Sequence, residues 1–164
     1  MALVDLYVER RRLRAEIVMG RFTRVADALN TVRTGFLAAT LPVGSLVPGD
    51  PSAEASALNS ELVLRLEDLR LVCPMEEDPP DAAPPDGRRP RERVQVTLDL
   101  GVWQVAGDLY VADRVGWIDF MAAAKGHFLP LAQATVFSTE IATPATYEFL
   151  LVNADRVSAL CEAT

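Results

Sequence analysis

The sequence is poor in the side chains that carry most catalytic and metal chemistry. Of its 164 residues, one is His and two are Cys. It has no Gly-rich phosphate loop, no G-x-S-x-G and no C-x-x-C, and a single His leaves few groups for acid–base catalysis near neutral pH. No Cys or acidic cluster surrounds His127 at the spacing of zinc ligands. We therefore expect no enzymatic activity, no catalytic residue, no metal and no cofactor.

Lysine and aromatic side chains are also scarce. Fifteen of the 16 basic residues are Arg, Lys125 being the exception, and aromatic residues make up 7% of the chain. The formal net charge is −7, so the average field repels nucleic acid and anionic membranes. The preference for Arg, together with abundant Ala, indicates a GC-rich bacterial coding bias rather than phosphate recognition.

Long hydrophobic runs are absent. No segment approaches the ~20 apolar residues of a membrane span, and the N-terminus lacks the charged start, apolar run and cleavage site of a signal peptide. We therefore expect a cytoplasmic protein. In that setting thiols stay reduced, which favours a structural role for Cys73 and Cys161 over the alternative of a disulfide between them.

What the sequence does contain is an internal duplication. The stretch from Val94 to Phe137 repeats the order of residue types found in the first 45 residues at a constant offset of 92. A later loop is four residues shorter in the second copy, and an offset of 88 then places Cys161 over Cys73. The duplication predicts one small unit used twice.

Both repeats are predicted to be mainly β, of the α+β type. Alternation of apolar residues predicts a hairpin at the start of each repeat, and a spacing of i, i+3, i+4 and i+7 predicts a short helix after it. In the first repeat (1–73), strands are expected at 4–9, 13–19, 36–41, 61–66 and 69–73, with a helix at 21–30 capped by Thr23. In the second (93–164), they are expected at 94–100, 103–111, 128–137, 147–152 and 157–161, with a helix at 117–124 capped by Asp113. The Pro-rich segment 74–92, which has acids at one end and arginines at the other, is expected to be an extended linker.

Five short strands in each repeat predict a small closed barrel, because closure removes exposed strand edges. The ending Phe149-Leu-Leu-Val-Asn-Ala-Asp-Arg-Val-Ser-Ala-Leu160 resembles the second motif of Sm-like barrels, where a strand breaks at a polar turn and resumes with an aliphatic residue. The chain also resembles an uncharacterised bacterial domain family with a hairpin, an Arg24-Val-Ala-Asp27 helix and a Phe-Leu strand. The Sm-like resemblance implies a barrel-like shape but no binding residues, since a helix replaces the RNA-contacting loop of that family.

Arginines cluster in the first repeat and provide the candidate interaction surface. Trp103 is a further candidate. It is expected at a hairpin tip, and the corresponding residue of the first repeat is Arg11. A core common to both repeats therefore does not need a Trp at this position. The candidate interaction residues are Arg10, Arg11, Arg12, Arg14, Arg21, Arg24 and Trp103. A solvated face is the alternative to a binding site, and an RNA site would favour interleaved lysines and exposed aromatic residues.

These observations predict a non-enzymatic protein–protein interaction module, an adaptor or scaffold with an unidentified protein partner. The repeats are expected to pack as a pseudo-dimer, because a unit of roughly 70 residues has little core of its own. Charge favours the pairing: residues 1–74 are neutral, whereas residues 94–164 carry three basic against eight acidic residues, or −5. The alternative is Sm-like nucleic-acid binding through the Arg-rich face of the first repeat.

Overall fold

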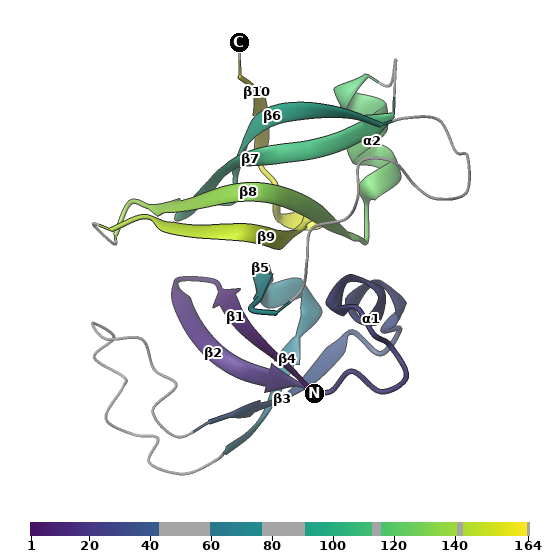
Figure 1. Ribbon diagram of the computed structural model, residues 1–164, viewed down its shortest axis with the longest axis vertical. Helices are drawn as coiled ribbons and strands as arrows, with labels where there is room; N and C mark the ends of the chain where they lie inside the picture. The colour runs from purple at the N-terminus through teal and green to yellow at the C-terminus, as the bar shows by residue number, and fades with distance from the viewer. Residues whose placement is uncertain (43–59, 77–90, 113–115, 141–142, 164) are drawn as a thin grey trace. The chain divides into compact units, whose positions relative to one another are not determined.

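The computed structural model of the chain describes residues 1–42, 60–76, 91–112, 116–140 and 143–163. The chain divides into two compact units, Met1–Glu77 and Asp78–Thr164, whose strands and helices are labelled in Figure 1. All the strand pairs described are antiparallel, and strands outnumber helices, which confirms the prediction of a mainly β protein. Within the described residues, no helix is long and apolar enough to cross a membrane.

The first unit contains five strands in the order β5-β1-β2-β3-β4. Its elements are β1 (Ala2–Val8), β2 (Arg11–Ile17), α1 (Val25–Thr31), β3 (Phe36–Leu41), β4 (Ser60–Arg65), the 3-10 turn η2 (Leu66–Asp68) and β5 (Leu69–Pro74). The β1–β2 hairpin pairs Ala2 with Ile17 and Val8 with Arg11. On its other side β1 pairs with β5, so β1 is a central strand, and four consecutive residues of it are buried.

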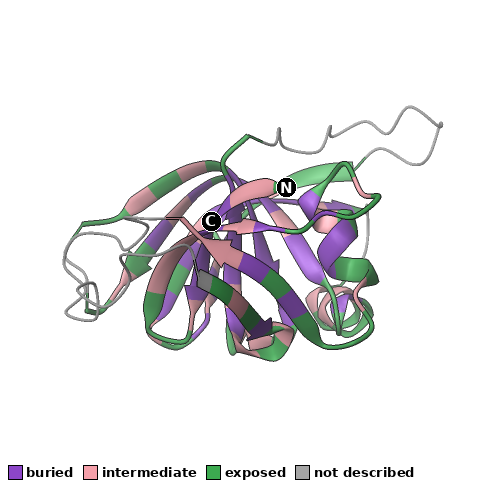
Figure 2. Cartoon of the chain, turned by 90° about the horizontal axis from the view of Figure 1, so that it is seen from below, coloured by how far each residue is buried: buried purple, intermediate pink, exposed green. Residues whose placement is uncertain are grey.

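The second unit has the corresponding order β10-β6-β7-β8-β9. Its elements are β6 (Arg91–Asp99), β7 (Trp103–Ala112), α2 (Trp117–Ala124), β8 (Phe128–Ser138), β9 (Ala145–Asn153), the 3-10 turn η3 (Ala154–Arg156) and β10 (Ala159–Glu162). The alternation of apolar residues in the sequence becomes an alternation of buried and exposed residues along the strands, which is visible as bands of colour in Figure 2. Asp99 closes the β6–β7 turn, where its Oδ1 accepts a hydrogen bond from the Gly101 amide at 2.9 Å.

The offsets found in the sequence recur in the positions of the elements. Helices α1 and α2 begin 92 residues apart, as do strands β3 and β8, and the turns η2 and η3 begin 88 residues apart. A backbone hydrogen bond recurs with them: Leu66 donates to the Gly35 carbonyl at 2.8 Å, and Ala154 donates to the His127 carbonyl at 3.0 Å. Both bonds tie the turn before the last strand of a unit to the segment that follows the helix.

The prediction of two closed five-stranded barrels is wrong. Among the described strands, no pairing joins β4 to β5 in the first unit or β9 to β10 in the second. The turn η2 does not fold β5 back onto β4. Instead β5 pairs with β1, for example through Leu6 and Val72, so β4 and β5 lie at opposite ends of an open strand order.

Several element boundaries differ from those predicted. Helix α1 begins at Val25 rather than at residue 21. Its N-cap residue is Arg24, whose side chain makes no capping hydrogen bond, rather than Thr23. Helix α2 spans the predicted residues with Gly116 at its N-cap, while the predicted cap Asp113 lies outside the described residues. Strands β5 and β6 also take in both ends of the predicted linker 74–92, because Pro74 and Arg91 have ladder partners. Residues 77–90 of that linker lie outside the described residues.

The two cysteines occupy equivalent strands but differ in exposure. Cys73 in β5 is buried and Cys161 in β10 is exposed, and neither forms a disulfide in the part of the chain that the structure describes. Burial among apolar side chains suits Cys73 to the predicted structural role.

Strands β7 and β8 approach closely at Gly107. The register shifts between Ala106 and Asp108, and a Cβ on Gly107 would lie 2.8 Å from Leu131 Cδ2 and 3.0 Å from the Ala132 carbonyl oxygen. At the offset of 92, the positions of Gly107 and Leu131 correspond to two alanines in the first unit. The larger Leu131 therefore occupies space that the missing side chain of Gly107 leaves open.

We expect the Gly107→Ala substitution to lower the free energy of unfolding by about 2 kcal/mol, because an added methyl group overpacks the contact with Leu131. In the Gly107→Ala/Leu131→Ala double variant, the loss should fall short of the sum of the single losses by about 1 kcal/mol. Urea denaturation of the wild type, the two single variants and the double variant measures the free energy of unfolding of each, from which both differences follow. Strictly additive losses would contradict this account of the contact.

Candidate functional site

The β1–β2 hairpin presents the arginines that the sequence singled out. Its register pairs Asp5 with Arg14 and Tyr7 with Arg12, which places all four side chains on one face. Arg12 Nη2 donates to Asp5 Oδ2 at 2.7 Å, and Arg14 Nε donates to Asp5 Oδ1 at 2.8 Å. The Asp5 side chain is fully buried, whereas those of Arg12 and Arg14 are 24% and 41% exposed. Two of the candidate arginines are thus engaged by one buried carboxylate.

Opposing effects set the ionisation of Asp5. Burial alone would raise the pKa of its carboxyl, but hydrogen bonds from Arg14 and Arg12, and the charges of both guanidinium groups, outweigh it. The pKa therefore lies below its ordinary value of 3.8, and the carboxylate stays charged at neutral pH. Asp5 is not among the candidate residues predicted from the sequence. Pairing the two strands of the predicted hairpin so that Asp5 lies opposite Arg14 would have predicted this ion pair.

The other candidate arginines do not gather into one uniform patch. The Arg21 guanidinium lies 5.5 Å from the centre of the Phe22 ring, as a cation–π contact. Arg10 and Arg24 take part in further interactions, and Arg11 is exposed at the start of β2. The structure therefore unites Arg12 and Arg14 around Asp5.

Trp103 begins β7 opposite Ser138 and is only 2% exposed. A side chain buried to this extent is not accessible to a separate protein. Its proposed role as an anchor between the repeats stays a prediction.

The ion cluster is specific to the first unit. At the offset of 92, its three members correspond to Thr97, Gln104 and Ala106, none of which is charged. The second unit instead pairs Arg93 with Asp108, with an Arg93 Nε to Asp108 Oδ2 distance of 2.8 Å. The hydrogen bond and charge of Asp108 raise the pKa of the Arg93 guanidinium.

Helix α2 is unusual in how little of it is buried. Seven of its eight residues are apolar, yet Ala124 is its only buried residue. Ile118 is 86% exposed. Helix α1, by contrast, buries three of its seven residues. An apolar helix with so little burial forms an accessible hydrophobic surface on the second unit.

The aromatic residues of α2 are held in fixed positions. The rings of Trp117 and Phe120 meet edge to face, with centroids 5.8 Å apart. Trp117 Nε1 donates to Glu162 Oε2 at 3.0 Å, which links the start of α2 to β10. After the helix, the Gly126 amide donates to Asp155 Oδ1 at 2.9 Å. The exposed helix is therefore tied at both ends to the last part of the unit.

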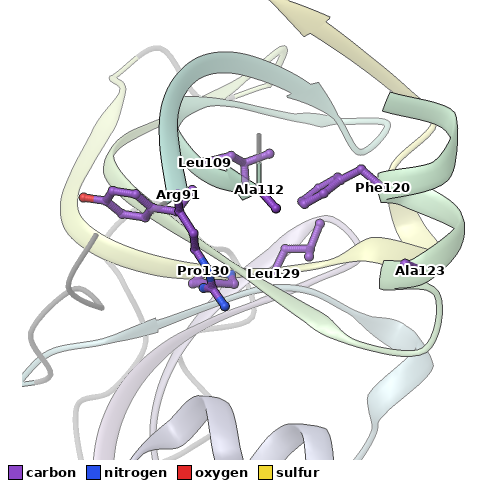
Figure 3. A pocket seen from close by; sticks show the side chains of 8 residues that line it. Arg91, Leu109, Ala112, Phe120, Ala123, Leu129 and Pro130 are labelled. Carbon is purple, nitrogen blue, oxygen red and sulfur yellow. The ribbon is translucent and has the colours of Figure 1, made fainter. Parts of the chain in front are cut away.

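A groove of about 320 Å3 lies beside α2 in the second unit. Figure 3 shows the side chains of Leu109, Phe120 and Leu129 converging from β7, α2 and β8, with Arg91 beside Pro130. The complete lining is Arg91, Leu109, Tyr110, Ala112, Phe120, Ala123, Leu129 and Pro130. Sequence reasoning missed this groove, because its residues come from separate elements whose spacing follows no motif.

The described residues contain no group of three or more His, Cys, Asp or Glu placed to hold a metal ion. His127 is exposed, and its Nδ1 lies 3.0 Å from the Lys125 carbonyl oxygen. Comparisons with protein-family models, curated proteins and solved structures found no match for this chain. The resemblances to Sm-like barrels and to an uncharacterised bacterial domain family therefore stay predictions.

We expect Asp5→Asn to lower the free energy of unfolding at pH 7 by about 2 kcal/mol, because the two arginines lose their buried partner. This is less than the usual 3–5 kcal/mol for breaking a buried pair, since Arg14 is partly solvated. Glu67→Gln, which breaks the exposed Arg65–Glu67 pair, is the control and should cost less than about 1 kcal/mol.

The difference in the free energy of unfolding between wild type and Asp5→Asn should depend on pH. Because the folded-state pKa of Asp5 is lowered, its ionisation stabilises the fold fully above about pH 4. This contribution is lost as the pH falls through the folded-state pKa. Denaturation of wild type and Asp5→Asn between pH 2 and about pH 7 should therefore show a difference that shrinks on acidification. A constant difference would show that Asp5 does not act through its charge.

Proposed function

We propose that this chain is a non-enzymatic protein-binding module, an adaptor or scaffold of the cytoplasm, and that α2 is its docking face. The observation that supports this function is the apolar character of α2 combined with the burial of Ala124 alone. Large exposed apolar surfaces are uncommon on proteins that act alone and mark sites of interaction with other proteins.

The chemistry of α2 defines the partner. Ile118, Met121 and Ala122 are spaced i, i+3 and i+4 and so lie on one face of the helix. Asp119 is exposed beside them, and residues 94–164 carry a net charge of −5. A complementary partner has an apolar groove that accepts a helix and a basic rim that faces the acidic surroundings.

The alternative function, nucleic-acid binding through the arginines of the first unit, has less support. Arg12 and Arg14 already neutralise Asp5, and Arg21 contacts Phe22. A backbone-binding surface needs cations that are available to phosphates, and each phosphate contact makes the affinity more dependent on salt.

We further propose that the two repeats pack as a pseudo-symmetric pair. The small size of each repeat and the difference in their net charge support this proposal.

We expect Ile118→Asp to reduce binding of the protein partner by at least tenfold, because a charge at the centre of an apolar contact is desolvated without compensation. Affinity capture from the native cytoplasm, quantified by mass spectrometry, measures this loss. Val63→Asp, which changes a residue that is 68% exposed in the first unit, is the control and should retain the partner.

Retention of the same partner by Ile118→Asp would refute the docking face. A steeply salt-dependent shift of single-stranded RNA by the wild-type chain, without a protein partner, would support the alternative function.

A protease site inserted between Ala82 and Pro85 tests the pseudo-dimer. We expect the cleaved fragments to elute together on a sizing column at micromolar concentration, because apolar contact should hold the repeats together once the chain is cut. Screened ion pairs contribute at most ~1 kcal/mol each, so the co-elution should persist in high salt. Separate elution of two folded fragments would show that the repeats are independent.

A further inference from the structure

The groove beside α2 arises where two neighbouring strands separate. The β7–β8 register runs from Trp103 opposite Ser138 to Asp108 opposite Ala132, and no later residue of β7 has a described partner in β8. Strand β7 nevertheless continues to Ala112, paired on its other side with β6. The divergence leaves space between the end of β7 and the start of β8, beside Phe120 and Ala123 of α2.

The repeated architecture does not require this groove. Strand β2 ends at Ile17, the position that corresponds to Leu109, whereas β7 runs three residues further. Two of the lining positions also differ: Phe120 corresponds to the buried Ala28, and Tyr110 to Val18. The second unit therefore has a longer strand and larger side chains where the first has a short strand and a small, buried residue. Such a difference indicates a role that is particular to the second unit.

The lining combines an apolar wall with one cation. Apart from Arg91 and the Tyr110 hydroxyl, the side chains that line the groove are apolar, and none is acidic. The side chain of Arg91 makes no hydrogen bond or ion pair with any residue that the structure describes, whereas the side chain of Arg93, on the same face of β6, is paired with Asp108. The Arg91 guanidinium thus offers a planar set of donors that matches a carboxylate.

We propose that this groove binds a small aliphatic monocarboxylate, with its carboxylate on Arg91 and its chain against Phe120 and Pro130, above a floor formed by the buried Leu109 and Leu129. The volume of about 320 Å3 is in the range of small-molecule sites. The net charge of −7 does not oppose this binding strongly, since physiological salt screens distant charges beyond about 8 Å. The groove uses Phe120 and Ala123 of α2, whereas the proposed docking face uses Ile118, Met121 and Ala122. The proposal for the groove therefore does not rest on the proposed protein partner.

Octanoate is the probe, titrated into the full-length chain below the concentration at which it forms micelles, with backbone amide chemical shifts as the readout. We expect saturable shifts confined to the groove and its immediate neighbours. Hexanoate should bind more weakly by a factor of roughly 15, because each buried methylene contributes about fourfold in affinity, or ~0.8 kcal/mol. Shifts that do not saturate, or that spread over both units, would refute a specific site.

Variants separate the role of the charge from that of the apolar wall. Arg91→Gln should lower octanoate affinity about tenfold and leave the affinity for 1-octanol unchanged, because only the carboxylate pairs with the guanidinium. Arg11→Gln makes the same change in net charge in the first unit and should leave octanoate binding unaltered. Equal octanoate affinity in the wild type and Arg91→Gln would overturn the proposal.

A third variant tests the location of the ligand. Ala123 is exposed on α2 and lines the groove, so Ala123→Trp should occupy the space and abolish binding of both octanoate and 1-octanol. The amide spectrum of the free variant checks its folding. If a folded Ala123→Trp protein binds octanoate as the wild type does, the ligand lies elsewhere and the proposal fails.

Discussion

The helix inserted between the second and third strands of each unit constrains the structure around it. In the second unit it follows a stretch of β7 that has no described partner in β8, and it ends just before β8. In the first unit β2 stays paired with β3 up to its last residue, Ile17. The backbone bonds from Leu66 to Gly35 and from Ala154 to His127 then fix the segment after the helix against the turn before the last strand. In the second unit, side chains of the helix line the space between the diverging strands.

The two units meet this constraint differently. In the first, the small Ala28 lets α1 bury its apolar face, and a charged cluster forms on the β1–β2 hairpin around Asp5. In the second, the bulkier Phe120 stands at the corresponding position, α2 stays largely exposed, and a groove opens beside it. The order of elements is thus common to both units, while the surface chemistry is not. Because function depends on sites rather than on fold, the differences between the repeats carry more functional information than their similarities.

Periodicity predicted the features that depend on local sequence. The alternation in residues 94–100 and the apolar spacing in residues 117–124 are local signals, and the structure places β6 and α2 there. Closure of a barrel depends instead on which strands pair across the unit, and the pairing of β5 with β1 leaves β4 without β5 as a neighbour. No local pattern encodes that choice.

The arginines show why composition alone misjudged the candidate site. Arg12 and Arg14 gave a signal of exposed positive charge, but the hairpin register turns both toward Asp5. The groove and the exposed face of α2 gave no signal, because the helical pattern of residues 117–124 predicted an amphipathic helix that buries its apolar side. A pattern indicates which residues can be buried, whereas burial itself depends on whether another element covers them.

The exposure of α2 has an energetic consequence. A helix of eight residues has little stability of its own, since nucleation is costly and most helical stability in proteins comes from packing. Packing here comes from the buried Ala124 and from the partly buried Trp117, Phe120 and Met121. The hydrogen bonds from Trp117 to Glu162 and from Gly126 to Asp155 add to it. A molecule that covers the apolar residues of α2 would add the missing burial and stabilise the folded unit in proportion to its occupancy. Binding at α2 would therefore raise the free energy of unfolding of the second unit.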